Sequence, residues 1–162
     1  MIKKFIICFM LTGLLLGCSS TTDENSSMAI RKKMDAILKS SDSAEIKLMH
    51  LEPLRFELAQ AYNNENKPDE AIPILQKLIE ENRNPHDPIF GTKFKMSAPF
   101  YGMEAIYFKE LAKSYALQKD AESEKKALKK AEQAQAMKEK LKPIEDERNR
   151  IEEKKKKDAL LN

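Results

Sequence analysis

The chain has 162 residues, of which 41% are hydrophobic and 34% are charged, and its 29 Lys and Arg residues nearly balance its 26 Asp and Glu residues. This balance gives no case for nucleic-acid binding, because proteins that bind nucleic acids concentrate positive charge. The small number of glycines and the predominance of Ala, Leu, Lys, Glu and Gln disfavour a fold built on strands and tight turns.

The amino-terminal segment has the layout of a secretory signal peptide. Lys3 and Lys4 give it a positively charged start, and residues 5–16 form a predominantly apolar run of 12 residues. As a helix this run would be about 18 Å long, which is shorter than the membrane hydrocarbon core of about 30 Å. It is therefore too short to span a membrane.

The run ends in Leu15-Leu16-Gly17-Cys18, which resembles the lipobox of bacterial lipoproteins. The resemblance implies cleavage after Gly17, a diacylglyceryl group on the thiol of Cys18, and acylation of the new amino terminus, for example by palmitate. Two or more acyl chains give stable anchoring, whereas one gives only reversible binding. The alternative is an ordinary signal peptide with a chance cysteine. Because Ser19 follows the cysteine, where an Asp would favour inner-membrane retention, we expect the outer membrane of a bacterial cell envelope.

This processing would leave a chain without disulfides, since Cys8 departs with the signal peptide and Cys18 carries lipid. Removing 17 of the 162 residues leaves 145, enough for one domain with one core. Residues 19–27 contain no apolar side chain, so we expect a flexible tether with a root-mean-square reach of about 15–18 Å.

Apolar residues recur at helical spacing through the rest of the chain, which predicts an all-α fold. A first helix is expected over residues 28–39, and residues 40–43 then offer capping side chains for a segment that runs to about residue 63. Pro53 inside this segment predicts either a kink or the start of a new helix. Beyond a polar turn at residues 63–67, Pro68 suits a helix start and Pro73 predicts a bend.

Residues 83–104 interrupt the helical pattern with prolines, glycines and aromatic residues, which predicts an irregular connection of roughly 15 residues. Helical spacing returns over residues 108–115. From residue 120 onward the apolar residues alternate spacings of three and four, as in a short coiled coil; they are Ala127, Ala131, Ala134, Met137, Leu141 and Ile144. Pro143 is expected to mark a boundary at which a second helix begins.

Two segments, residues 53–85 and 105–134, resemble the tetratricopeptide repeat, a helix–turn–helix unit of 34 residues. The residues that carry the resemblance are Leu58, Ala59, Tyr62, Ala71, Leu75, Leu78 and Pro85 in the first segment, and Phe108, Leu111, Ala112 and Tyr115 in the second. Arg55 departs from the pattern at a position where the family has tryptophan. Glu124 departs where it has alanine, and the alanines of the second segment fit only if three residues are inserted in its turn. The alternative is a plain helical bundle whose spacing is accidental.

The resemblance implies a short antiparallel helical array whose concave groove binds a partner. Groove positions of the family correspond here to Phe56, Gln60, Asn63, Lys109, Lys113 and Ala116. Lys109 and Lys113 lie one helical turn apart and would present two cations to an acidic segment or a carboxy terminus. The alternative is that they are ordinary exposed lysines.

No pattern of catalytic or metal-binding residues stands out. His50 and His86 lie far apart without ligand-like neighbours, and no glycine-rich phosphate loop or nucleophile elbow occurs. We therefore expect no enzyme activity, no metal and no cofactor.

The sequence thus predicts four parts: a signal peptide over residues 1–17, a lipidated Cys18 with a tether to residue 27, a repeat-like helical domain over residues 28–134, and a charged helical extension over residues 135–162. The functional hypothesis is a membrane-anchored, non-catalytic adaptor that binds another envelope protein. The alternative is a structural helical-bundle or coiled-coil lipoprotein that self-associates.

Overall fold

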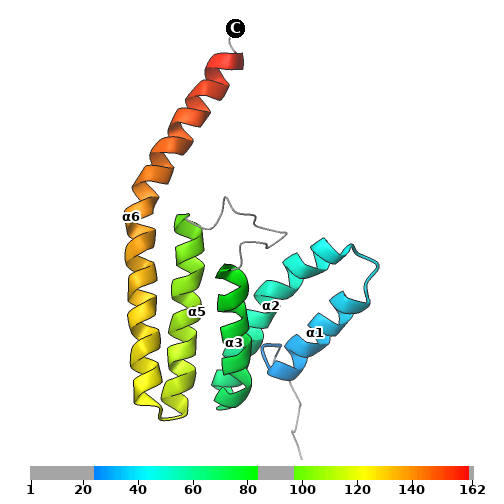
Figure 1. The fold of residues 1–162 in the computed structure, drawn as a ribbon. Helices are drawn as coiled ribbons and strands as arrows, with labels where there is room; N and C mark the ends of the chain where they lie inside the picture. The colour runs from blue at the N-terminus through cyan, green and yellow to red at the C-terminus, as the bar shows by residue number, and fades with distance from the viewer. Residues whose placement is uncertain (1–23, 84–96, 161–162) are drawn as a thin grey trace, which may run out of the picture.

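The computed structural model describes residues 24–83 and 97–160. These residues form five helices and no strand, so the predicted all-α fold is confirmed (Figure 1). The helices are α1 (Ser27–Lys39), α2 (Ala44–Asn64), α3 (Pro68–Arg83), α5 (Ala98–Leu117) and α6 (Ala121–Leu160). Gly17 and Cys18 lie outside the described residues.

Side-chain caps fix where several helices begin. Ser26, Ser43 and Ser97 each accept the backbone N–H of the residue three positions on, at 3.3 Å in every case. Asp120 accepts the N–H of Ser123 at 3.0 Å in the same way at the start of α6. These bonds satisfy amide groups that have no partner within the helix. The expected break at residues 40–43 and the helix start at Pro68 are confirmed.

The prolines interrupt none of the helices. Pro53, Pro73 and Pro143 lie inside α2, α3 and α6. All three are exposed, so the carbonyl that each deprives of an intrahelical partner can be hydrated, and the helix continues. The prediction of a second helix beginning at Pro143 is therefore wrong, as is the alternative of a new helix at Pro53. α6 also crosses the expected domain boundary between residues 134 and 135 without a break.

α5 begins earlier than predicted. The irregular connection was expected to reach residue 104, but residues 98–104 are the first two turns of α5. Ser97 caps this start, and the carboxylate of Glu145 on α6 accepts the N–H of Ala98 at 2.8 Å. The remainder of that connection, residues 84–96, lies outside the described residues.

The helices form one row in which each packs on the next, from α1 through α2, α3 and α5 to α6 (Figure 1). The most deeply buried side chains of the core include Leu75, Leu78 and Tyr107, each with 2% exposure or less. None of the helices in the described ranges is long and apolar enough to cross a membrane.

The α2–α3 and α5–α6 hairpins are joined by turns of the same geometry. The carbonyl of Tyr62 accepts the N–H of Lys67 at 2.8 Å, and the carbonyl of Tyr115 accepts the N–H of Asp120 at 3.0 Å. Asn66 and Lys119 occupy the left-handed region with φ of 58° and 60°. The second turn therefore contains no insertion of three residues. Each residue of one hairpin corresponds to the residue 53 positions later in the other.

Both turns lie at the same end of the molecule as the start of α1, whereas the carboxy-terminal end of α6 projects from the opposite end (Figure 1). Two contacts hold this arrangement. The backbone N–H and the hydroxyl of Ser27 donate to the Glu65 carboxylate at 2.8 and 2.9 Å, and Gln118 donates to the Asp69 carboxylate. Ser27, at the start of α1, therefore lies beside the hairpin turns.

Candidate protein-interaction surface

α2 and α5 lie side by side and run in the same direction. Near the start of their contact, Phe56 packs on Tyr107 with ring centroids 5.3 Å apart, and the Tyr107 hydroxyl donates to Glu52 at 3.1 Å. Further along both helices, Asn63 contacts Glu110 and Ser114. Since the contacting residue numbers rise together, the helices are parallel. α3 packs against both of them, and no other helix in the described ranges packs against both, so among the described residues the side of the pair away from α3 is open.

Asn63, one of the six expected groove residues, lies in the interface between the two helices. Its side chain is bonded on both sides: Nδ2 donates to Oε1 of Glu110 at 2.7 Å, and Oδ1 accepts from the Ser114 hydroxyl at 2.9 Å. The residue is only 3% exposed. The side chain of Asn63 therefore joins α2 to α5.

The other expected groove residues lie nearer the surface. Phe56 is half-buried against Tyr107, and Gln60 is half-buried, whereas Lys109, Lys113 and Ala116 are exposed. The Lys113 ammonium donates to Oδ1 of Asn64 at 2.8 Å and lies 3.6 Å from the Glu110 carboxylate. This bond joins the cation on α5 to the end of α2.

The open side also carries apolar residues that sequence reasoning missed. Met103 and Ile106 on α5 are 39% and 45% exposed, and Met49 on α2 is 59% exposed. Met103 and Ile106 precede the two lysines along the open side of α5, because residues three or four positions apart share a helix face. The helical period would have found Met103, but this residue was assigned to the irregular connection. We call this surface the α2–α5 face; it consists of Met49, Gln60, Met103, Ile106, Lys109 and Lys113.

Ion pairs brace the helices behind this face. Arg55 donates to both carboxylate oxygens of Glu81 on α3, at 3.1 and 2.7 Å, which gives a role to the residue that departs from the repeat pattern. Arg83 on α3 pairs with Glu104 on α5, and its guanidinium lies 5.3 Å from the ring centroid of Phe108. These pairs hold α3 against α2 and α5.

Burial raises the pKa of the Tyr107 phenol well above its usual value, and the neighbouring Glu52 carboxylate raises it further. Tyr107 is only 1% exposed. The phenol therefore stays protonated and serves as a hydrogen-bond donor between α5 and α2.

No group of three His, Cys, Asp or Glu side chains in the described ranges could hold a metal ion. His50 is exposed on α2. His86 lies outside the described residues.

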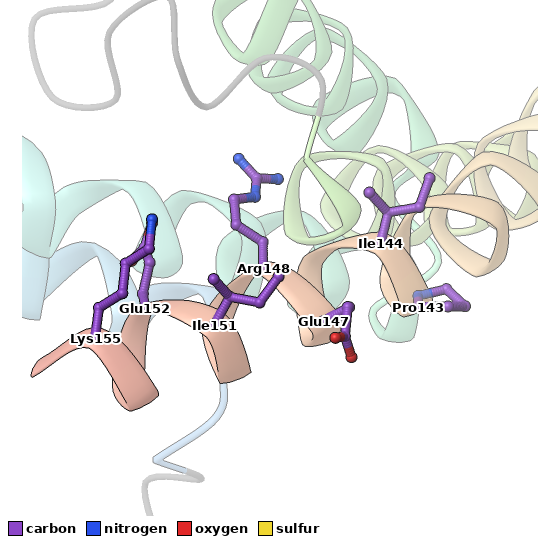
Figure 2. A pocket seen from close by; sticks show the side chains of 7 residues that line it. All are labelled: Pro143, Ile144, Glu147, Arg148, Ile151, Glu152 and Lys155. Atoms are coloured by element: carbon purple, nitrogen blue, oxygen red, sulfur yellow. The ribbon is translucent and has the colours of Figure 1, made fainter. Parts of the chain in front are cut away.

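A second surface lies on the part of α6 that extends past the first residues of α5. Figure 2 shows a hollow whose labelled residues, among them Ile144, Arg148, Ile151 and Lys155, all belong to α6. One helix lines the hollow, so it is a helix face and not an enclosed cavity. Ile144 and Ile151 are 59% and 48% exposed on this face and alternate with the two cations.

Comparisons with protein-family models, with curated proteins and with solved structures found no match to this chain.

Proposed function

We propose that this chain is a membrane-anchored, non-catalytic adaptor that binds an extended segment of another envelope protein along the α2–α5 face. One observation carries the proposal. The two hairpins share turn geometry and register, and α2 and α5 lie in parallel with one side that no described helix covers. Repeated helical hairpins of this kind stack and use the surface lined by their first helices for binding.

The lipobox-like sequence before Cys18 supports anchoring through lipid on this residue. The tether would join the domain at Ser27, beside the hairpin turns. Mass spectrometry of the chain isolated from bacterial envelopes tests the anchor. We expect an acylated Cys18 at the amino terminus, and an unmodified amino terminus at another residue would contradict the proposal.

The chemistry of the α2–α5 face supports a partner segment that combines apolar and acidic side chains. Met103 and Ile106 offer apolar surface along one half of α5, and Lys109 and Lys113 offer positive charge along the other. An extended peptide bound along this face would place an apolar side chain against Met103 and Ile106 and a carboxylate against the two lysines. Apolar anchors and charges at defined positions set the specificity of peptide binding.

Site-specific photocrosslinking in intact envelopes tests the face directly. A photoreactive residue at Ile106 is expected to capture a discrete partner, whereas the same residue at Lys129, on the outer side of α6, is not. Equal capture at both positions, or capture at Lys129 alone, would contradict the assignment of the face.

Charge reversal tests the two lysines. The double variant Lys109→Glu/Lys113→Glu is expected to reduce crosslinking at Ile106 by about tenfold, because like charges now meet the acidic segment. The matched control, Lys125→Glu/Lys129→Glu, changes the net charge equally on exposed α6 positions and is expected to leave the yield unchanged. An equal loss in both variants would remove Lys109 and Lys113 from the site.

The rival function is a structural lipoprotein that self-associates through α6. The exposed Ile144 and Ile151 on the helix face in Figure 2 favour this function. In a coiled coil, however, Arg148 and Lys155 would occupy core positions that alternate with Ile144 and Ile151, and buried unpaired cations are costly. Sedimentation of the detergent-solubilised chain over a range of concentrations separates the two functions, because only self-association predicts a mass that increases with concentration.

A further inference from the structure

Methionine is the one sulfur-containing residue type in the part of the chain that the structure describes, because both cysteines precede residue 24. The methionines of these residues fall into two groups by exposure. Met28, Met49 and Met103 are 67%, 59% and 39% exposed, whereas Met34 and Met137 are half-buried. A peroxide in solution therefore reaches the thioethers of the first three more readily than those of the other two.

Two of the three exposed methionines belong to the α2–α5 face. Met49 lies in the second turn of α2 and Met103 in the second turn of α5. Each precedes the Phe56–Tyr107 contact by no more than about two helical turns. The third apolar residue of the face is Ile106, so methionine supplies two of its three apolar side chains.

Met28, the third exposed methionine, lies away from this face. It follows Ser27, which bonds to Glu65 beside the hairpin turns. Those turns come after the carboxy-terminal ends of α2 and α5, whereas Met49 and Met103 lie near the amino-terminal ends of the same two helices. Met28 therefore offers an exposed thioether at the opposite end of the helix pair.

Hydrogen peroxide oxidises a thioether in a balanced two-electron step. A lone pair of the methionine sulfur attacks one peroxide oxygen, an S–O bond forms, and the O–O bond breaks. The departing hydroxide takes the proton from the transferred oxygen and leaves as water. The sulfur is oxidised to a sulfoxide, and the peroxide is reduced.

The sulfoxide changes what the face offers to a partner. Methionine sulfoxide is polar and chiral, in contrast to the flexible apolar thioether. An apolar side chain of a bound segment has no donor for the sulfoxide oxygen, so covering that oxygen would remove it from water without a replacement hydrogen bond. Oxidation at Met49 and Met103 therefore opposes binding along the apolar half of the face.

We propose that Met49 and Met103 form a reversible oxidation site through which peroxide lowers the affinity of the α2–α5 face for its partner. The proposal rests on the adaptor function proposed above. Thiol-dependent methionine sulfoxide reductases reverse the modification: two electrons and two protons restore the thioether, and the oxygen leaves as water. Oxidation thus releases the partner, and reduction restores binding.

Peptide mass spectrometry tests the modification without any partner. The full chain in detergent is exposed to hydrogen peroxide for increasing times, and the reaction is stopped with catalase. Met49 and Met103 are expected to gain one oxygen atom at least about threefold faster than Met34 and Met137. Equal rates at all four positions would overturn the proposal, because the face would then hold no preferred oxidation site.

Photocrosslinking tests the effect on binding. A chain with a photoreactive residue at Ile106 is mixed with a detergent extract of bacterial envelopes, either untreated or after peroxide and catalase. The discrete crosslinked band of the untreated chain is expected to weaken about tenfold on oxidation and to return after reductase treatment. A band that oxidation leaves unchanged would overturn this proposal alone. Absence of the band from the untreated chain would overturn the adaptor function, and this proposal with it.

Leucine variants locate the effect, because leucine keeps the apolar volume of methionine and has no sulfur to oxidise. Met49→Leu/Met103→Leu is expected to give the full band both before and after peroxide, although Met28 is still oxidised. The matched control Met28→Leu is expected to lose the band about tenfold after peroxide, as the wild-type chain does. Loss of the band from the oxidised double variant would overturn the proposal, since another residue would then carry the effect.

Discussion

The two helical hairpins agree in their first helices and turns and differ in their second helices. Leu58 and Ala59 of α2 correspond to Leu111 and Ala112 of α5, and all four are buried. In the second helices the correspondence fails, because Leu75 of α3 is 0% exposed and its counterpart Leu128 of α6 is 43% exposed. The difference follows from position in the row: α3 packs between α2 and α5, whereas α6 is the last helix.

The outer side of α6 differs in character from the corresponding side of α3. Ile72, Gln76, Ile79 and Arg83 share the side of α3 on which Gln76 donates to the Tyr115 hydroxyl at 3.2 Å and Arg83 pairs with Glu104. The residues 53 positions later are Lys125, Lys129, Glu132 and Ala136, all exposed. A charged surface of this kind cannot bury a further hairpin. Terminal repeats of helical arrays require such a polar outer side.

Truncating the two leucines gives the largest expected difference between the hairpins. Leu75→Ala is expected to lower the free energy of unfolding by about 2–5 kcal/mol, because it leaves a cavity between packed helices. Leu128→Ala is expected to cost less than about 0.5 kcal/mol, since the side chain is already in contact with solvent. Urea unfolding followed by circular dichroism at the helix band measures both values.

The first helices provide the matched control for this pair. Leu58→Ala and Leu111→Ala are both expected to cost about 2–5 kcal/mol, because Leu58 and Leu111 are buried to a similar degree. If Leu128→Ala destabilised the chain as much as these two do, the second helices would not differ as the structure indicates.

The polar link between α2 and α5 gives the next largest effect. Asn63→Ala is expected to cost about 1–3 kcal/mol, because the buried Ser114 hydroxyl and the Glu110 carboxylate each lose one of their partners. The counterpart of Asn63 in the second hairpin is Ala116, which is exposed because no described helix lies against that side of α5. Ala116→Ser is therefore expected to leave the stability nearly unchanged. Thermal unfolding compares the two, and an equal loss would contradict the role of Asn63 in joining the helices.

The two turns are expected to differ in how their stability depends on pH. The Lys67 ammonium and the Ser27 backbone amide bond to the Glu65 carboxylate and lower its pKa from 4.5 to about 2. The stabilisation that Glu65 gives the start of α1 is therefore present above pH 4.5 and is lost as the pH falls toward 2. Its magnitude is about 1 kcal/mol, because solvent screens a partly exposed group. The counterpart of Glu65 is Gln118, which does not titrate.

The Ser27 amide resonance reports this change in nuclear magnetic resonance spectra recorded between pH 6 and pH 2. It is expected to shift with the titration of Glu65, and Glu65→Gln is expected to abolish that shift. A Ser27 resonance that moves equally in the variant would show that another group titrates there.

Local sequence signals predicted most of the helical organisation. Serine caps, Pro68 and apolar periodicity located α1, α2 and α3 because each acts within a few residues. The interpretation of Pro143 and the late start of α5 were wrong for a different reason. A proline is tolerated within a helix when its position faces solvent, and α5 begins at a cap that is supported by Glu145, 47 residues away. Neither condition can be read from neighbouring residues.

The candidate site was predictable only in part. Lys109 and Lys113 were found because helical spacing places them on one side of α5, and the structure leaves both exposed. The side chain of Asn63 was assigned to an open groove, yet it meets two residues of α5, about 50 positions later in the chain. Which side of a helix faces a neighbour depends on packing partners, and these were unknown from the pattern of α2 alone.

The smallest expected difference concerns the two residues in the left-handed region. Lys119, at φ 60°, has a β-carbon that crowds the backbone in this conformation, whereas Asn66, at φ 58°, belongs to a residue type that adopts it more readily. Lys119→Gly is therefore expected to stabilise the chain by about 0.5–1 kcal/mol, because relief of this crowding exceeds the added flexibility of the unfolded chain. Asn66→Gly is expected to change stability by less than about 0.3 kcal/mol. Both variants keep the same turn, so parallel urea unfolding measures the difference, and a destabilised Lys119→Gly variant would mean that the second turn is not built like the first.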